Sequence, residues 1–203
     1  MTDWLRLTAA DWVPRLVGAG VEPAVAARLA TFLELLARWQ RSTNLIGAVT
    51  PERLVGGHVA ESLAALPLLP LAGALLDVGS GNGFPAVPLL LARPALRGTL
   101  LEPRERRWAF LKEAVRVLEL DAVVDRGRIQ AHRGGPYDAI TVRALAPSAW
   151  AAAARPLLAD DGVLVSWPGA GPLPELAGWR PVVTSAVPAS GRGAAVAWRR
   201  CFT

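Results

Sequence analysis

The spacing of apolar residues changes character near position 72. Before it, apolar positions recur every three or four residues, which is the period of a helix with one buried face. The clearest helical stripe consists of Val25, Leu29, Phe32, Leu36 and Trp39. Thr50-Pro51-Glu52 then supplies a capping residue, a proline suited to the first helical position and an acid for the first turn. Residues 1–70 are therefore predicted to form a helical cap.

Beyond position 72, short continuous apolar runs alternate with helical segments. The runs lie at 74–79, 98–102, 122–124, 137–142 and 162–167, and the helices at 85–92, 104–118 and 147–158. This alternation is typical of a parallel sheet covered on both faces by helices. The tail has two β-rich segments, 181–187 and 194–202, which a Gly191-Arg192-Gly193 turn joins into a predicted antiparallel hairpin at the sheet edge. We expect one domain, with an α/β core at 71–203 carrying the cap.

Composition excludes several kinds of site. Cys201 is the one cysteine of the 203-residue chain, so an intramolecular disulfide cannot form. His58 and His132 are the two histidines, too few for a zinc site built from cysteine and histidine. The first ten residues lack the apolar segment of a signal peptide, and no uncharged run approaches the roughly 20 residues that span a bilayer. We expect a soluble, cytoplasmic, monomeric protein that holds no metal.

Basic residues exceed acidic ones, 22 against 17, and the excess lies in the second part of the chain. Residues 1–70 balance six arginines with six acids, so the whole net charge of +5 falls beyond them. Lys112 is the single lysine. A preference for arginine is typical of GC-rich coding sequence and also of phosphate contacts, and the charge alone does not decide between these explanations.

A glycine-rich loop joins the first predicted strand to the next helix. It reads Asp77-Val78-Gly79-Ser80-Gly81-Asn82-Gly83-Phe84-Pro85, and its glycines allow a tight turn and a close approach of ligand to backbone. A dinucleotide site requires Gly-x-Gly-x-x-Gly and a Walker loop requires Gly-Lys-Ser/Thr; the loop matches neither. The alternative is a turn that binds nothing, with Glu102 as a solvated strand end.

The pattern acid-x-Gly-x-Gly-x-Gly resembles the first motif of class I S-adenosylmethionine methyltransferases. The resemblance implies that the backbone at Gly79, Ser80, Gly81 and Gly83 packs against the ribose and methionine parts of that cofactor. It also implies that Asp77 meets the cofactor's ammonium group, directly or through water. Glu102 ends the second predicted strand, 102 − 79 = 23 residues after the loop begins, where a carboxylate accepts both ribose hydroxyls.

Further motifs narrow the resemblance. In chain order they are Trp39-Gln40-Arg41-Ser42-Thr43-Asn44-Leu45, His58-Val59-Ala60-Glu61-Ser62, the glycine loop, Gly127-Arg128 and Val142-Arg143-Ala144. From residue 35 to 169 the chain resembles the RsmG (GidB) family, bacterial methyltransferases that modify guanine N7 in small-subunit (16S) ribosomal RNA near the decoding site.

Membership of that family implies a class I, Rossmann-like, mostly parallel seven-stranded sheet. It implies S-adenosylmethionine as the cofactor, and 16S ribosomal RNA or the small ribosomal subunit as the partner. The cofactor contacts that it implies are Gly79, Phe84, Ile129, Gln130 and Arg143.

The chain departs from the family pattern at several positions. Glu61 and Glu102 stand where the family usually has aspartate, which keeps the carboxylate. Ile129-Gln130 replaces Ala-Glu, so an acceptor for the adenine amino group remains without its charge. Trp167-Pro168-Gly169 stands where the family tends to have Lys-Gly, and an RNA contact at that lysine is not carried over.

Guanine N7 bears an in-plane lone pair in the neutral base, so methyl transfer to it needs positioning rather than a general base. We predict that Arg143 and Arg128 position the base, its phosphate or the cofactor. A donor on N7 would block attack, so guanine O6 or a phosphate is the favoured contact. The alternative for Arg143 is a salt bridge with Asp138 or Asp77.

Six arginines are predicted to flank the cofactor cleft and contact the RNA backbone. They are Arg104, Arg106, Arg107, Arg192, Arg199 and Arg200. His58, Glu61 and Ser62 lie at i, i+3 and i+4 of one predicted helix, which favours a polar packing cluster under the cofactor loop over a Ser/His/acid triad.

Three other functions stay open at this point. One is a class I methyltransferase that acts on a small molecule or a protein. Another is a cofactor-binding, ribosome-associated module without turnover. A nicotinamide dehydrogenase comes last, because the glycine spacing disfavours it.

Overall fold

The N-terminal third of the computed structural model, which describes residues 3–169, 171–185 and 193–201, is helical. Helix α1 spans Ala9–Gly18 and α2 spans Pro23–Thr43. A second helical stretch combines α3 (Pro51–Arg53), a π-helical segment (Leu54–Val59) and α4 (Ala60–Leu63). The predicted cap at Thr50 is confirmed, since its Oγ1 accepts the Arg53 N–H at 3.2 Å.

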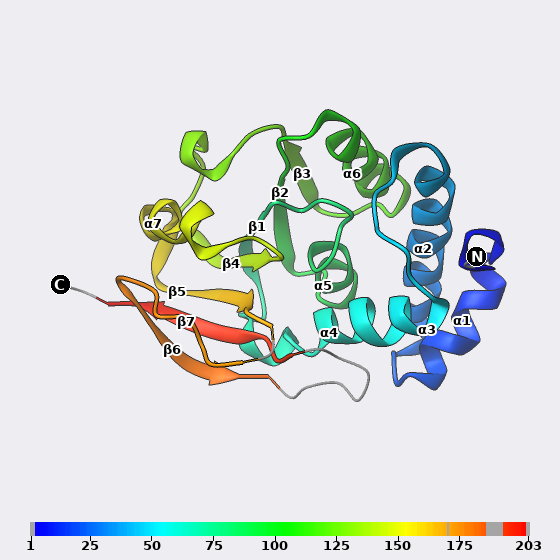
Figure 1. Ribbon diagram of the computed structural model, residues 1–203, viewed down its shortest axis with the longest axis horizontal. Helices are drawn as coiled ribbons and strands as arrows, with labels where there is room; N and C mark the ends of the chain where they lie inside the picture. The colour runs from blue at the N-terminus through cyan, green and yellow to red at the C-terminus, as the bar shows by residue number, and fades with distance from the viewer. Residues whose placement is uncertain (1–2, 170, 186–192, 202–203) are drawn as a thin grey trace.

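The described strands form one seven-stranded sheet in the order β3-β2-β1-β4-β5-β7-β6 (Figure 1). Their bounds are β1 Gly73–Val78, β2 Leu96–Leu101, β3 Ala122–Asp125, β4 Tyr137–Arg143, β5 Leu158–Trp167, β6 Trp179–Thr184 and β7 Val196–Arg200. Strands β1 to β5 pair in parallel, and β7 is antiparallel to β5 and β6. The predicted mostly parallel sheet with antiparallel C-terminal strands is confirmed. The strand order reverses at β1, where open α/β sheets place their ligands.

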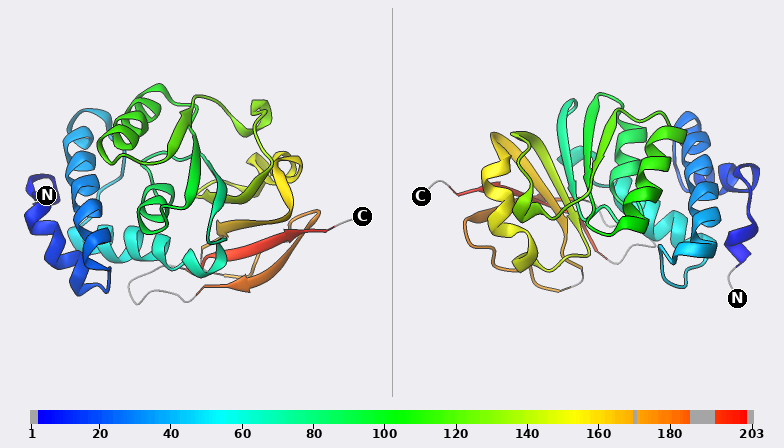
Figure 2. Two further views of the ribbon diagram at one scale, coloured as in Figure 1. Left: turned by 180° about the vertical axis from the view of Figure 1, so that it is seen from behind. Right: turned by 90° about the horizontal axis from the view of Figure 1, so that it is seen from above.

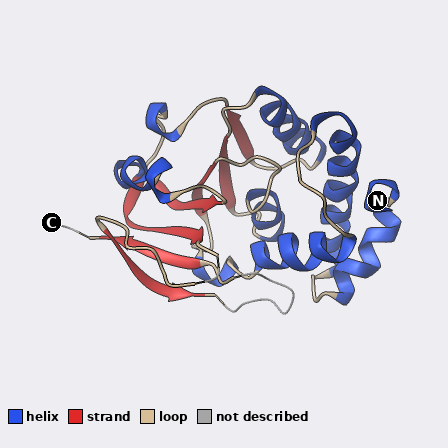
Figure 3. Cartoon of the chain, in the orientation of Figure 1, coloured by secondary structure: helices blue, strands red, loops and turns tan. Residues whose placement is uncertain are grey.

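Helices lie on both faces of this sheet (Figures 2 and 3). Helices α5 (Ala86–Ala92) and α6 (Glu105–Val117) join α2 on one face, and α7 (Ala151–Ala154) lies on the other. Side chains of β1 alternate between the two cores: Leu75 belongs to the core shared with α2, and Leu76 to the core shared with α7. Within the described ranges, no helix has the length and apolar character needed to cross a membrane.

Aromatic rings join the helical cap to the sheet. Phe32 of α2 lies 5.3 Å from the ring of Phe84 and 6.2 Å from that of Phe110 on α6, centroid to centroid. Trp39, two positions further along the same helical stripe, lies 5.8 Å from the Phe110 ring, centroid to centroid. The cap and one sheet face therefore share a single hydrophobic core, in which Phe32 is fully buried.

Residues 147–158 do not form the single continuous helix that the sequence predicts. The segment consists of a 3-10 turn (Pro147–Ala149), the short α7 and a second 3-10 turn (Arg155–Leu157), and β5 begins at Leu158. Pro156 explains the break, because proline lacks the N–H that would continue the helical ladder. The predicted turn at Gly191-Arg192-Gly193 lies largely outside the described residues.

Replacing Phe32 with alanine tests the link between cap and core. Because the ring is fully buried against two other rings, we expect Phe32→Ala to lower the free energy of unfolding by about 3–5 kcal/mol in urea titrations. Leu71→Ala is the control, since Leu71 is 81% exposed and its truncation should cost less than about 0.5 kcal/mol. Equal losses in the two variants would contradict a cap packed as part of the core.

Candidate cofactor-binding site

The glycine loop leaves β1 at the carboxyl edge of the sheet and is held against β2. The amides of Gly79 and Ser80 both donate to the Leu101 carbonyl, at 2.8 and 3.1 Å. Gly79, Gly81 and Gly83 have φ angles of +72°, +54° and +87°, a region that L side chains rarely adopt. A Cβ on Gly79 would lie 2.7 Å from Leu145 Cδ1, the end of a flexible side chain that would have to move.

Glu102 is tied directly to this loop. One carboxylate oxygen, Oε2, accepts the Gly81 N–H at 2.9 Å, and Oε1 accepts the Arg104 N–H at 2.8 Å. The residue is only 3% exposed, so it is not the solvated strand end of the alternative reading. Each oxygen has a second lone pair for a further donor.

A cavity of about 820 Å³ opens beside Glu102, at the point where the strand order reverses. That volume is typical of small-molecule sites. The predicted residues that line it are Gly79, Glu102, Arg104, Arg107, Arg128, Ile129 and Gln130. Ala144, the last residue of the Val142-Arg143-Ala144 motif, and Leu145, the residue after it, also line the cavity, and the sequence did not predict them as site residues. Ala144 has φ +58°, and Leu145 is 40% exposed in the cavity.

The remaining predicted cofactor residues lie under or behind the loop. Ser80 is buried and its Oγ donates to the Asp77 carbonyl at 3.0 Å. Gly83 passes close to the cap, since a Cβ there would lie 3.0 Å from Phe32 Cζ. The Phe84 ring is turned toward the cap and lies between the rings of Phe32 and His58. The ring centroids of Phe84 and His58 are 5.2 Å apart. Gly81 approaches Arg107, whose Nη1 would lie 3.3 Å from an added Cβ.

Asp77 is a buried carboxyl, with 1% of its surface exposed. Burial raises its pKa to about 6, opposed by the hydrogen bond that Thr141 Oγ1 donates to Oδ1 at 2.6 Å and by the charge of Arg143. Its other oxygen, Oδ2, is buried and has no hydrogen-bond partner among the described residues. This oxygen therefore has unused acceptor capacity, although Asp77 and Arg143 are not among the residues that line the cavity.

Arg143 pairs with a residue of the cap. Its Nη2 donates to a carboxylate oxygen of Glu61 and, at 3.0 Å, to the Gly57 carbonyl. Arg143 therefore forms a salt bridge, as the alternative predicts, but with Glu61 rather than with Asp138 or Asp77. Asp138 instead accepts the Ala74 N–H at 2.7 Å. Burial lowers the pKa of Arg143, and Glu61 opposes that shift. Arg143 Nη1 is buried without a partner in the described part of the chain.

The His58, Glu61 and Ser62 group is a packing cluster, as the spacing predicts. Ser62 Oγ donates to the His58 carbonyl of its own helical stretch at 2.6 Å, and Glu61 faces Arg143. The hydroxyl and the carboxylate therefore point to different partners, which a catalytic triad would not allow. In the described ranges, no group of three His, Cys, Asp or Glu side chains could hold a metal ion.

The predicted RNA-contacting arginines fall into separate places. Arg104 and Arg107 line the cavity, and Arg106 is exposed nearby on α6. Arg199 and Arg200 do not flank the cleft: because β7 is antiparallel to β5, its last residues lie at the amino edge of the parallel strands. Arg192 lies outside the described residues.

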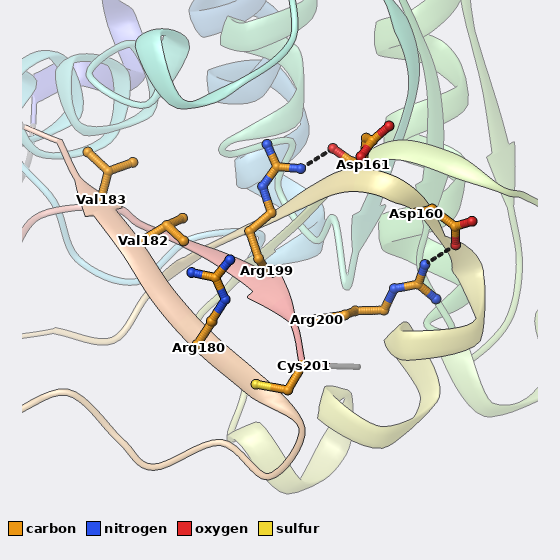
Figure 4. A pocket seen from close by; sticks show the side chains of 8 residues that line it. All are labelled: Asp160, Asp161, Arg180, Val182, Val183, Arg199, Arg200 and Cys201. Carbon is orange, nitrogen blue, oxygen red and sulfur yellow. Dashed lines mark hydrogen bonds and ion pairs between the residues drawn. The ribbon is translucent and has the colours of Figure 1, made fainter. Parts of the chain in front are cut away.

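Figure 4 shows the second cavity, of about 920 Å³, to which Arg199 and Arg200 belong. Arg200 pairs with Asp160 at 2.7 Å, and Arg199 donates to the Asp161 carbonyl. Arg180 of β6 stands directly opposite Arg199 in the strand register. Arg199 and Arg200 are thus engaged with the segment that carries Asp160 and Asp161, so this cavity is less suited to a polyanion than the basic mouth beside Glu102.

The family model for GidB, rRNA small subunit methyltransferase G, matches residues 26–186. The chain belongs to this family. A ribosomal RNA small subunit methyltransferase G from Xanthomonas axonopodis pv. citri is 37% identical over 171 residues, 81% of this chain and 80% of the relative. Another from Halorhodospira halophila is 41% identical over 144 residues, 70% of this chain and 68% of the relative. The protein is thus a methyltransferase of the GidB family.

Solved structures agree with this fold. A crystal structure of a MtNAS mutant in complex with S-adenosylmethionine has a TM-score of 0.62 at 14% identity, covering 96% of this chain and 78% of that one. The mitomycin 7-O-methyltransferase MmcR has a TM-score of 0.60 at 15% identity, covering 98% and 69%. At these identities the likeness concerns the fold, which is that of class I methyltransferases.

The buried carboxyl of Asp77 predicts an unusual pH dependence of stability. The folded protein holds this proton more tightly than the unfolded chain, so the free energy of unfolding should fall as pH rises from about 4 to about 6, by roughly 3 kcal/mol from this group. Asp77→Asn removes the titrating group, and urea titrations of both cofactor-free proteins across this range measure the difference. Exposed acids contribute equally to both, so parallel curves would contradict the assignment.

Proposed function

We propose that this protein transfers a methyl group from S-adenosylmethionine to N7 of a guanine in 16S ribosomal RNA near the decoding site. The observation that carries the proposal is Glu102 in a cavity at the strand-order reversal, tied to the glycine loop, in a chain of the GidB family. The specific base and the RNA partner follow the family, whose members are named for small-subunit ribosomal RNA.

The residues around the cavity suit the two ends of the cofactor. Glu102 offers lone pairs for ribose hydroxyls, and Ile129 gives an apolar wall for the adenine. Gln130 Nε2 donates to the Ala149 carbonyl at 2.7 Å, which leaves its Oε1 to accept the adenine amino group. These contacts support binding of a nucleoside at the outer end of the cavity.

The methionine end is matched by two buried polar atoms that have no partner among the described residues. Asp77 Oδ2 is an acceptor suited to an ammonium group, and Arg143 Nη1 is a donor suited to a carboxylate. Buried polar groups are normally satisfied, so an orphaned acceptor and an orphaned donor near the same loop support a zwitterionic ligand there.

The chemistry asks little of the protein beyond placement. Bound S-adenosylmethionine would supply a methyl group on a sulfonium; the lone pair of guanine N7 would form the new N–CH3 bond as the S–CH3 bond breaks, and S-adenosylhomocysteine would leave as the neutral thioether. The wall of Leu145 and the buried glycine loop limit the access of water. Arg128 lies exposed on the cavity wall, where its guanidinium can hold guanine O6 or a phosphate. Arg143 is instead held by Glu61 and Gly57, and we assign it to the cofactor side.

The decisive experiment is a transfer assay. Protein is incubated with radiolabelled S-adenosylmethionine and small ribosomal subunits from cells that lack the activity, and the label is mapped. We expect it at N7 of a single guanine. Gly79→Ala should reduce the rate by about 100-fold, since alanine rarely adopts a φ of +72° and its Cβ would also displace Leu145 on the cavity wall.

Gly47→Ala is the matched control, because Gly47 has open space around it and should keep the wild-type rate. Label found only in protein or in small molecules would overturn the RNA substrate. Wild-type transfer by the Gly79 variant would overturn the cofactor site.

The RNA-facing part of the proposal predicts a salt effect. Arg104→Ala and Arg128→Ala should each weaken RNA binding and reduce the slope of log K against log salt by about 1, if each arginine meets one phosphate. Arg180→Ala, an exposed arginine at the opposite edge of the sheet, should leave the slope unchanged. Filter-binding titrations over a range of salt measure all three, and an equal effect at Arg180 would argue against an RNA path at the cavity mouth.

A further inference from the structure

We propose that Glu61, a residue of the helical cap, is a positioning residue that sets the orientation of Arg143 for the methionine end of the cofactor. The inference rests on the proposed function, because it gives Arg143 a role at the bound cofactor. According to this inference, the helical cap contributes to cofactor binding through Glu61, in addition to any role in RNA binding or stability.

Glu61 lies between two arginines in a nearly dry environment. Its side chain is 5% exposed and that of Arg143 is 14% exposed. One oxygen, Oε2, accepts Arg143 Nη2, and the other, Oε1, lies 3.8 Å from Arg53 Nη2. Removing one partner of a buried ion pair leaves an uncompensated charge, so the arginine would lose both its counter-charge and its fixed direction.

The helical stretch is built to present two acceptors to Arg143. The π-helical turn at Leu54–Val59 carries the Gly57 carbonyl, which accepts Arg143 Nη2 at 3.0 Å beside the Glu61 contact. Gly57 also makes room for Arg53: a Cβ there would lie 2.6 Å from Arg53 Cζ. Turns of this kind are often found at functional sites, because they redirect groups that a regular α-helix would keep in its own ladder.

Trp167 encloses the same pair from the neighbouring strand. It stands opposite Arg143 in the register of β4 and β5, and its ring centroid is 5.9 Å from Arg143 Cζ. Its Nε1 donates to the Glu61 carbonyl at 3.2 Å. Trp167 thus contacts both members of the ion pair.

The result is a guanidinium with one nitrogen committed and one unused. Nη2 is held by Glu61 and Gly57, while the buried Nη1 has no partner among the described residues. A guanidinium is planar, so fixing Nη2 also fixes where Nη1 points. Arg143 directly follows Val142, which pairs with Val78 at the end of β1, so Arg143 leaves β4 beside the start of the glycine loop. Preorganisation of this kind lowers the entropy lost when the cofactor binds.

The test is the affinity for S-adenosylmethionine, measured by calorimetry on the full chain. Glu61→Gln keeps the size of the side chain and removes its charge, and we expect about tenfold weaker binding. The KM for S-adenosylmethionine should rise to a similar extent while the KM for RNA stays unchanged. Glu61→Asp restores the carboxylate and should recover most of the affinity. Glu52→Gln, the same substitution at an exposed site of the same helical stretch, should bind like the wild type.

A double-mutant cycle separates positioning from a merely structural role. If Glu61 acts through Arg143, then adding Glu61→Gln to Arg143→Gln should cause no further loss of affinity. An equal loss in both backgrounds, or wild-type binding by Glu61→Gln beside an impaired Arg143→Gln, would overturn the inference and leave the proposed function standing. Wild-type binding by Arg143→Gln would instead show that Arg143 does not bind the cofactor. It would overturn both the cofactor role of Arg143 in the proposed function and the positioning role of Glu61. Thermal unfolding of each variant confirms that folded protein is compared.

Discussion

The loop between β1 and α5 is closely packed at its glycine positions, and much of the rest of the structure depends on this constraint. On one side a Cβ at Gly79 would strike Leu145, which belongs to the segment after β4. On the other side a Cβ at Gly83 would press on Phe32 of the cap. The lack of a Cβ at these two glycines therefore allows the loop to pack against both the cap and the segment after β4, which lines the cavity. The positive φ angles of Gly79, Gly81 and Gly83 also favour glycine at these positions, because other residues rarely adopt them.

Charge is buried around this loop, and nearly all of it is matched by the protein itself. Glu102 accepts two backbone amides, and Glu61 lies between two arginines. Asp77 accepts the Thr141 hydroxyl but keeps one oxygen without a partner in the described chain, as does one nitrogen of Arg143. Polar groups left unsatisfied inside a protein are costly, and a bound ligand is one way in which they become satisfied. The proposed methionine end of the site depends on these two unmatched atoms, and the proposed nucleoside end depends on the cavity beside Glu102.

Local patterns predicted most of the fold. The helical stripe of α2, the cap at Thr50 and the succession of strands and helices depend on neighbours along the chain, and the structure has them close to the predicted positions. The helix at 147–158 failed because Pro156 interrupts an otherwise helical composition, and β5 begins earlier than its apolar run suggests. Glu102 was found from its spacing to the glycine loop, because two consecutive parallel strands bring their carboxyl ends to one edge.

The sequence by itself determined the class of fold, the glycine loop and the carboxylate one strand later, since each follows from periodicity or from a short spacing. Only the tertiary structure decided that Arg143 pairs with Glu61, 82 residues away, and that the Phe84 ring faces the cap. It also separated Arg199 and Arg200 from the cleft, because the antiparallel course of β7 carries them to the far edge of the sheet. Those outcomes depend on how distant segments cross and which way a strand runs, and neither is encoded in the spacing of residues along the chain.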